Sequence, residues 1–182
     1  MTRFSPELQL DNLGIDLIRV KKAKILDVGC GRNADLVNFL RNQGIEAEGI
    51  DGLVHNEDHL IQGWVLDLKS IPRPSKNYGV VVTHMNPSLY DPRTDKNEKN
   101  AENFSWRAAR IILEMLRVVQ QSGELRCFPS LKFLDEKIKR LDLPIEHEPS
   151  YFKGRWILGH VPVDVKPAYQ DMFDYRTIIR KD

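Results

Sequence analysis

The sequence lacks the features that mark secreted, membrane-spanning and strongly nucleic-acid-binding proteins. Only two of its 182 residues are cysteines, Cys30 and Cys127, so no disulfide framework is expected. No apolar run approaches the roughly 20 residues of a membrane-spanning helix, and the first ten residues are too polar for a signal peptide. The 27 basic and 26 acidic residues give a net charge of +1, which supplies no global attraction to nucleic acid or membrane. We therefore expect a cytoplasmic protein without membrane contact.

No metal site is expected either. His55 and His59 lie four residues apart with acidic residues between them, but no third ligand is evident. A zinc site in a protein needs three or four protein ligands. The two histidines are therefore interpreted as ordinary polar residues.

What the sequence does contain is a glycine turn directly after a short apolar segment. Residues 24–33 read KILDVGCGRN, in which the predicted strand 24–28 is followed by Gly29, Cys30 and Gly31. An amphipathic helix is predicted to begin at Ala34, with Asn33 as its cap. A strand that turns through glycines into a helix exposes backbone N–H groups, which suit a carboxylate, a phosphate or a ribose-bearing ligand. The turn therefore marks a candidate binding site.

The length and the order of elements predict a single α/β domain. We expect a leading helix within residues 1–22, a core over 24–163 and a tail over 164–182. Residues 86–105 are polar and rich in turn formers, which indicates a long surface loop. The last two strands are joined at Lys153-Gly154 and read as a hairpin. Strands are predicted at 24–28, 47–50, 63–66, 78–85, 124–128, 145–152 and 155–163, and helices at 5–20, 34–43, 106–119 and 130–141.

Alternating strands and helices imply a mainly parallel sheet covered on both faces. We expect a three-layer sandwich with a doubly wound, seven-stranded sheet and an antiparallel C-terminal hairpin strand. Ligands of such sheets bind outside the carboxyl ends of the strands. Asp27, Asp51 and Asp67 all fall at the carboxyl ends of predicted strands, so they should converge on one crevice. The alternative is that acidic residues simply favour strand ends and turns.

The segment ILDVGCGRN resembles the first motif of the Rossmann-like, class I S-adenosylmethionine-dependent methyltransferases. The resemblance extends over residues 24–163, where RVVQQSGELRC and ILGHVPV are also similar to the family's later segments. Asn33 departs from the family pattern because it replaces the usual third glycine. The resemblance implies S-adenosylmethionine as cofactor, bound by Asp27, Gly29, Cys30, Gly31, Asn33, Asp51, Gly52, Asp67, Leu68, His84 and Met85.

Each of these positions has a role that the resemblance implies. The turn from Gly29 to Gly31 would lie against the methionine moiety, with Asp27 in support. Asp51 would bind the ribose hydroxyls, and Asp67 with Leu68 would face the adenine. His84 and Met85, at the end of the fourth predicted strand, would border the methionine end and the acceptor.

Catalytic residues are harder to predict. His84 is either a general base at the acceptor or a hydrogen-bonded histidine at a strand end. Asn86 and Tyr90 lie in NPSLY, which is faintly similar to the Asn-Pro-Pro-Tyr segment of amino-group methyltransferases. Asn-Pro is, however, a common turn in any protein.

The resulting prediction is a methyltransferase that acts on a small-molecule acceptor. Three alternatives stay open. The run from Gly29 to Ala34 fits the looser G-x-G-x-x-G/A pattern of nicotinamide-dinucleotide oxidoreductases, with Asp51 at a suitable distance for a ribose. The chain could also be a binding module for S-adenosylmethionine without catalysis. A nucleic-acid methyltransferase is disfavoured because the chain has no room for a separate recognition domain.

Overall fold

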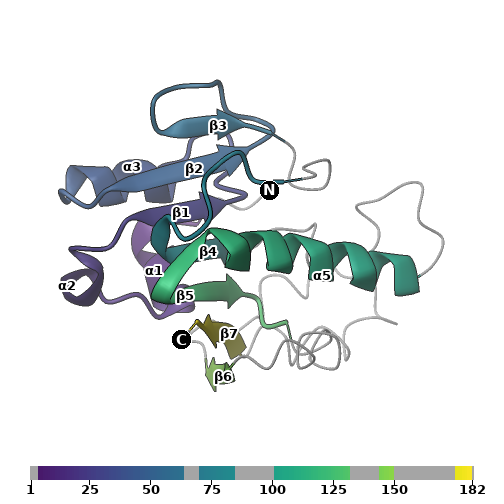
Figure 1. Ribbon diagram of the computed structural model, residues 1–182. Helices are drawn as coiled ribbons and strands as arrows, with labels where there is room; N and C mark the ends of the chain where they lie inside the picture. The colour runs from purple at the N-terminus through teal and green to yellow at the C-terminus, as the bar shows by residue number, and fades with distance from the viewer. Residues whose placement is uncertain (1–3, 64–69, 85–100, 132–143, 150–174, 182) are drawn as a thin grey trace.

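Seven strands form a single sheet in the computed structural model, which describes residues 4–63, 70–84, 101–131, 144–149 and 175–181. Figure 1 shows the strand order β3-β2-β1-β4-β5-β7-β6 across the molecule. Neighbouring strands from β3 to β5 are parallel, whereas β7 runs antiparallel to both β5 and β6. The strands are β1 (Ile25–Val28), β2 (Ala47–Asp51), β3 (Leu60–Gln62), β4 (Tyr78–His84), β5 (Val119–Phe128), β6 (Ile145–Pro149) and β7 (Tyr175–Arg180).

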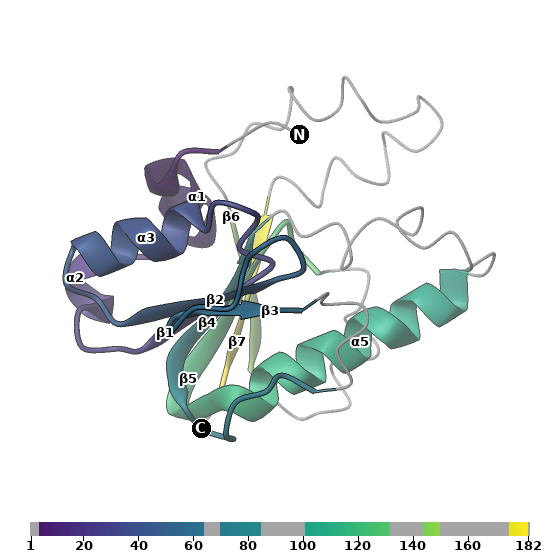
Figure 2. The same ribbon diagram turned by 90° about the horizontal axis from the view of Figure 1, so that it is seen from above.

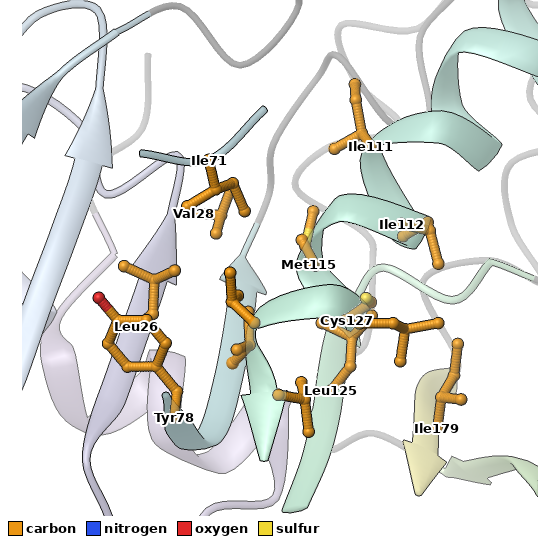
Figure 3. Close-up of a cluster of buried hydrophobic side chains, with 14 of the residues drawn as sticks. Leu26, Val28, Ile71, Tyr78, Ile111, Ile112, Met115, Leu125, Cys127 and Ile179 are labelled. Atoms are coloured by element: carbon orange, nitrogen blue, oxygen red, sulfur yellow. The ribbon is translucent and has the colours of Figure 1, made fainter. Parts of the chain in front are cut away.

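Helices cover both faces of the sheet, as Figure 2 shows. One face packs against α1 (Pro6–Leu13), α2 (Leu17–Val20) and α3 (Asp35–Asn42), which contribute leucines and valines to one core cluster. The other face packs against α5 (Ala101–Val118), whose inward side chains meet those of β5 and β7 in Figure 3. The predicted three-layer sandwich with a mainly parallel, seven-stranded sheet is therefore confirmed. Among the described residues, no helix is long and apolar enough to span a bilayer.

The prediction of one leading helix over residues 5–20 was wrong. Ser5 caps α1 as expected, but the helix ends at Gly14, and α2 begins only at Leu17. Gly14 has φ +65°, and a Cβ built on it would lie 2.2 Å from Cζ of Arg176. The same guanidinium donates to the carbonyl of Asp11 at 3.0 Å. Gly14 ends the helix as a left-handed C-cap, a conformation that favours glycine, and the guanidinium of Arg176 fills the space beside it.

Three predicted boundaries in the middle of the chain were also wrong. The third strand lies at Leu60–Gln62, ahead of the predicted 63–66, of which only Gly63 is described. Helix α5 starts at Ala101, so the predicted loop 86–105 ends earlier; its residues 86–100 lie outside the described part. The predicted turn after α5 is part of β5 instead. In the pairing of β5 with β4, Val119 lies opposite Tyr78 and Glu124 lies opposite Val80, so the residues between them form a bulge. Ser122, within this bulge, has φ +58°.

The antiparallel strand was predicted in the wrong place. β6 pairs with β7, in a register that sets Ile145 opposite Ile179 and Pro149 opposite Tyr175. The predicted partner at 155–163 lies outside the described residues, as does the predicted helix 130–141 beyond Leu131. Strand β7 comes from the segment predicted to be a tail. Ile178 and Ile179 are fully buried there, and this burial stabilises the strand between β5 and β6.

A buried carboxylate on β2, that of Glu48, accepts three hydrogen bonds on the face of the sheet that α5 covers. Glu48 accepts from Nζ of Lys24 at 2.7 Å, from Nε of Arg73 at 2.6 Å and from the Tyr78 hydroxyl at 2.7 Å. Burial by itself would raise the pKa of Glu48, but these three hydrogen bonds outweigh it and lower the pKa to about 2. Glu46 contacts the same lysine at 2.9 Å from a mainly exposed position.

These two glutamates form a matched pair for a stability test. The side chain of Glu48 is 11% exposed and that of Glu46 is 63% exposed. We expect Glu48→Gln to lower the free energy of unfolding by about 2 kcal/mol, because it removes the anionic partner of Arg73 and the more buried of the two anionic partners of Lys24. Glu46→Gln should cost less than about 0.5 kcal/mol. Urea denaturation at pH 7 measures both.

The pH dependence gives a second readout of the Glu48 network. The pKa of Glu48 is below its ordinary value of 4.5 when the protein is folded. Its contribution to stability is therefore complete above about pH 4.5 and is lost as the pH falls through about 2. The difference between wild type and Glu48→Gln should shrink over that interval, and a difference independent of pH would contradict this assignment.

Candidate functional site

The predicted glycine turn connects β1 to α3 at the carboxyl edge of the sheet. Gly29 and Gly31 have φ +87° and +72°, conformations that side chains disfavour. The N–H groups of Gly29 and Cys30 both donate to the carbonyl of Ile50, at 2.7 and 3.3 Å. A Cβ on Gly31 would meet no atom of the described residues within 4 Å, so among these residues the space beside it is open. The turn is therefore tied to β2 on one side and accessible to a ligand on the other.

Asn33 does not cap α3 as predicted. Ala34 occupies the cap position with φ +47°, and no side chain bonds to the first turn of the helix. Asn33 instead accepts, through its carbonyl, a hydrogen bond of 2.9 Å from Nδ2 of Asn38. The cap position is thus found one residue later than predicted.

Asp51 joins the end of β2 to the glycine turn. Its Oδ2 accepts from the N–H of Gly31 at 3.0 Å, and its Oδ1 accepts from the N–H of Leu53 at 2.8 Å. Each carboxylate oxygen retains a further lone pair for another donor. Gly52 follows directly and is half-buried. Asp51 therefore stands beside the open space at Gly31 with acceptor capacity to spare.

Asp27 is the buried acid of the site. It lies in the middle of the sheet, 2% exposed, and within the described part of the chain its Oδ1 has no hydrogen-bond partner. Burial, together with the negative charge of Asp51, raises the pKa of Asp27 to about 7. A buried acceptor without a donor costs about 1–3 kcal/mol. The site therefore favours a ligand that brings a donor or a positive charge.

The side chain of Cys30 packs against Gly49 on β2. A Cβ on Gly49 would lie 2.7 Å from Sγ of Cys30 and 3.0 Å from Cγ2 of Val37, so the thiol fills the place of the missing side chain. Burial raises the pKa of the thiol, and the nearby Asp27 and Asp51 raise it further. Cys30 is thus a packing residue, and its main chain alone can serve the predicted binding role.

His84 lies at the end of β4 and contacts two phenylalanine rings. Its ring stacks on Phe128 at 5.3 Å and meets Phe4 edge to face at 5.1 Å. Nδ2 of Asn12 lies 3.1 Å from Nε2 of His84, and because an amide nitrogen only donates, Nε2 accepts. The ring is therefore neutral with its proton on Nδ1, which agrees with burial lowering the pKa of His84 to about 3. This geometry supports a hydrogen-bonded strand-end histidine and does not favour a general base.

The remaining predicted positions lie outside the described residues. These are Asp67, Leu68, Met85, Asn86 and Tyr90. Sequence reasoning missed Asn12, which α1 places against His84. The available signal was a polar residue beside Leu13 on the inward face of the predicted helix. The described residues contain no group of three side chains that could hold a metal ion.

The sequence and the structure were compared with those of known proteins. No family model and no curated protein matches the sequence. A SAM-dependent methyltransferase from Archaeoglobus fulgidus matches in structure with a TM-score of 0.58 and 16% identity, over 97% of this chain and 95% of that one. The plantazolicin methyltransferase BpumL in complex with SAH matches with a TM-score of 0.53 and 13% identity, over 97% and 84%. The [4+2]-cyclase SpnF matches with a TM-score of 0.51 and 16% identity, over 97% and 79%.

The chain has the Rossmann-like fold of the class I S-adenosylmethionine-dependent methyltransferases. The strand order and the antiparallel β7 are typical of that fold, and the structural matches extend over nearly the whole chain. The resemblance predicted from ILDVGCGRN is therefore confirmed for the fold.

The buried acid yields a prediction for the ligand-free protein. The pKa of Asp27 is 3.8 ordinarily and about 7 when folded, so between these values the folded protein holds a proton that the unfolded chain has released. Stability then falls as the pH rises from about 4 to about 7. Asp27→Asn removes this titration, and its free energy of unfolding should exceed that of wild type by about 1–4 kcal/mol at pH 8.

Chemical denaturation from pH 4 to pH 8 measures the effect. Asp58→Asn, which removes an exposed acid between β2 and β3, is the matched control and should show no growing difference. If the advantage of Asp27→Asn stays constant over this range, the carboxyl group does not titrate as a buried acid.

Proposed function

We propose that the protein binds S-adenosylmethionine beside the glycine turn and transfers its methyl group to a small-molecule acceptor. One observation carries the proposal. The hydrogen bond from Gly31 to Asp51 fixes an open, glycine-lined main chain beside an acid with free acceptor capacity, on a fold shared with methyltransferases.

The residues present fit this cofactor. The open space at Gly31 admits a ligand against the main chain, and the unpartnered Oδ1 of Asp27 suits a cationic group. Asp51, with Gly52, would accept from the two vicinal ribose hydroxyls. Gly29, Cys30 and Gly31 would contact the methionine moiety through their main chain. Asp67 and Leu68 at the adenine, and Met85 beside the acceptor, are proposed from the resemblance alone.

The protein's part in such a reaction is alignment. S-adenosylmethionine, when bound, supplies an electrophilic methyl group on a positively charged sulfur. The turn and Asp51 would hold the cofactor in one orientation, and the charge of Asp27 would complement its positive charge. His84, kept neutral by burial, would border the methionine end without repelling a cation. Asn86 and Tyr90 remain proposed acceptor contacts.

A second candidate is a cofactor-binding protein that carries out no methyl transfer. The described residues offer no free basic nitrogen at the end of β4, because Nε2 of His84 already accepts from Asn12. The [4+2]-cyclase SpnF has the same fold, so the fold alone does not prescribe the reaction. A small-molecule acceptor and a cytoplasmic location stay predictions for this chain, and a nucleic-acid acceptor stays disfavoured.

A ligand screen by thermal unfolding tests the proposed cofactor. S-adenosylhomocysteine at a hundredfold excess over its Kd should stabilise the protein by about 2.7 kcal/mol, because it binds only the folded state. Oxidised and reduced nicotinamide dinucleotides should leave the melting temperature unchanged. Stabilisation by a dinucleotide and not by S-adenosylhomocysteine would replace the proposal with the oxidoreductase alternative.

The role of Asp51 is tested by Asp51→Asn. A hydrogen bond to a charged acceptor contributes about 1.5–3 kcal/mol, so the variant should bind S-adenosylhomocysteine about 10- to 100-fold more weakly by calorimetry. The amide retains one oxygen for the turn, and the protein should stay folded. Asp58→Asn, at an exposed position of the same connection, should bind like wild type. Unchanged affinity in Asp51→Asn would remove this residue from the site.

A further inference from the structure

The inner side of α1 carries a polar group with an unused acceptor. Asn12 is completely buried, and within the described residues its Oδ1 has no donor, although its Nδ2 is bonded to His84. A buried carbonyl oxygen without a donor costs stability, so its retention calls for an explanation. The free oxygen points to a donor that the described residues do not provide.

Asn12 and Asp27 lie on the same face of the sheet. Asp27 pairs with Val82 on the neighbouring strand, and His84 is two residues beyond Val82, so side-chain alternation places Asp27 and His84 on one face as diagonal neighbours. Val82 belongs to the cluster covered by α1 and α3, which identifies the face. The amide of Asn12 reaches His84 on that face. Oδ1 of Asn12 and Oδ1 of Asp27, which both lack a partner among the described residues, therefore belong to one layer near the carboxyl ends of β1 and β4, which we call the α1 corner.

A third polar atom without a partner among the described residues lies on the other face of the sheet and does not belong to this corner. Oγ1 of Thr83 is also buried without a partner among the described residues, but Thr83 pairs with Cys127, which belongs to the cluster beneath α5. Thr83 therefore faces the opposite layer. The corner on the α1 side contains acceptor oxygens, one of them on an acid, and this composition suits a primary ammonium group with its three N–H donors.

We propose that Asn12 is a cofactor-positioning residue, whose side-chain carbonyl accepts a hydrogen bond from the α-ammonium group of the bound S-adenosyl amino acid while Asp27 balances its charge. The inference rests on the proposed function and adds to it a residue outside the glycine motif. The same amide holds the His84 ring, so one side chain orients both the cofactor and the end of β4.

Helix α1 is held firmly enough to make this contact specific. Nη1 of Arg126 donates to the carbonyls of Leu13 and Gly14, at 3.1 and 2.7 Å, and Nη1 of Arg176 donates to that of Asp11. Both arginines belong to the sheet and are paired with glutamates beside them. Because the carbonyls around Asn12 are fixed to β5 and β7, its amide is oriented before a ligand arrives, which lowers the entropy cost of binding.

The test compares two ligands that differ in the amino-acid part. S-adenosylhomocysteine contains the ammonium group, and 5′-methylthioadenosine lacks the whole amino-acid moiety. Asn12→Leu should weaken S-adenosylhomocysteine about 10- to 100-fold by calorimetry, and should change the affinity for 5′-methylthioadenosine less than about twofold. Thr83→Val, which removes the unpartnered atom on the other face, is the matched control and should affect neither ligand.

The outcomes separate the inference from the proposed function. Equal weakening of both ligands by Asn12→Leu would show a purely structural role, and unchanged binding of both would show no role; either result overturns the inference. If wild type binds neither ligand, the proposed function itself fails. Should Asn12→Leu not fold, wild type can be measured with S-adenosylhomocysteine and with its analogue that has hydrogen in place of the amino group. A loss of about tenfold or more with the analogue is expected, and equal affinity would refute the ammonium contact.

Discussion

The hydrogen bond between the N–H of Gly31 and the carboxylate of Asp51 is the constraint on which the site depends. It joins the turn after β1 to the end of β2, and two hydrogen bonds to the carbonyl of Ile50 support it. With the turn held in this way, Asp51 stands close enough to Asp27 to raise the pKa of that buried acid. The free protein thus maintains two neighbouring acids and an unsatisfied oxygen, a cost that a cationic ligand would offset.

The elements that sequence reasoning predicted well are those encoded locally. β1, β2 and β4 are short segments buried on both faces, and the glycine turn has two left-handed glycines. The failures have causes distant in sequence. The left-handed Gly14 ends α1, and the carbonyls at this end of the helix are bound by Arg126 and Arg176, far along the chain. The bulge in β5 depends on its pairing with β4, which no local pattern reveals.

In the candidate site, too, some residues were predictable from local sequence and others depend on tertiary packing. Asp27 and Asp51 were predicted from strand ends and are brought together by the parallel register of β1 and β2. The state of His84 was left open by the sequence, because burial between two phenylalanines and an amide decides it. Asn12 was not predicted at all, since its importance arises only when α1 packs over the end of β4. Local motifs therefore predicted which residues form the candidate site, and tertiary packing determined their hydrogen bonds and protonation.

The position of β7 has a consequence for the order in which the protein can assemble. β7 lies between β5 and β6, yet it is synthesised after every other described strand. Until residues 175–180 leave the ribosome, β6 has no partner among the described strands, and the edge of β5 that β7 covers lacks that partner too. The five parallel strands that carry the glycine turn can form earlier, as N-terminal segments do during synthesis. The nascent chain can therefore form the part of the sheet that carries the glycine turn before β7 joins β5 to β6.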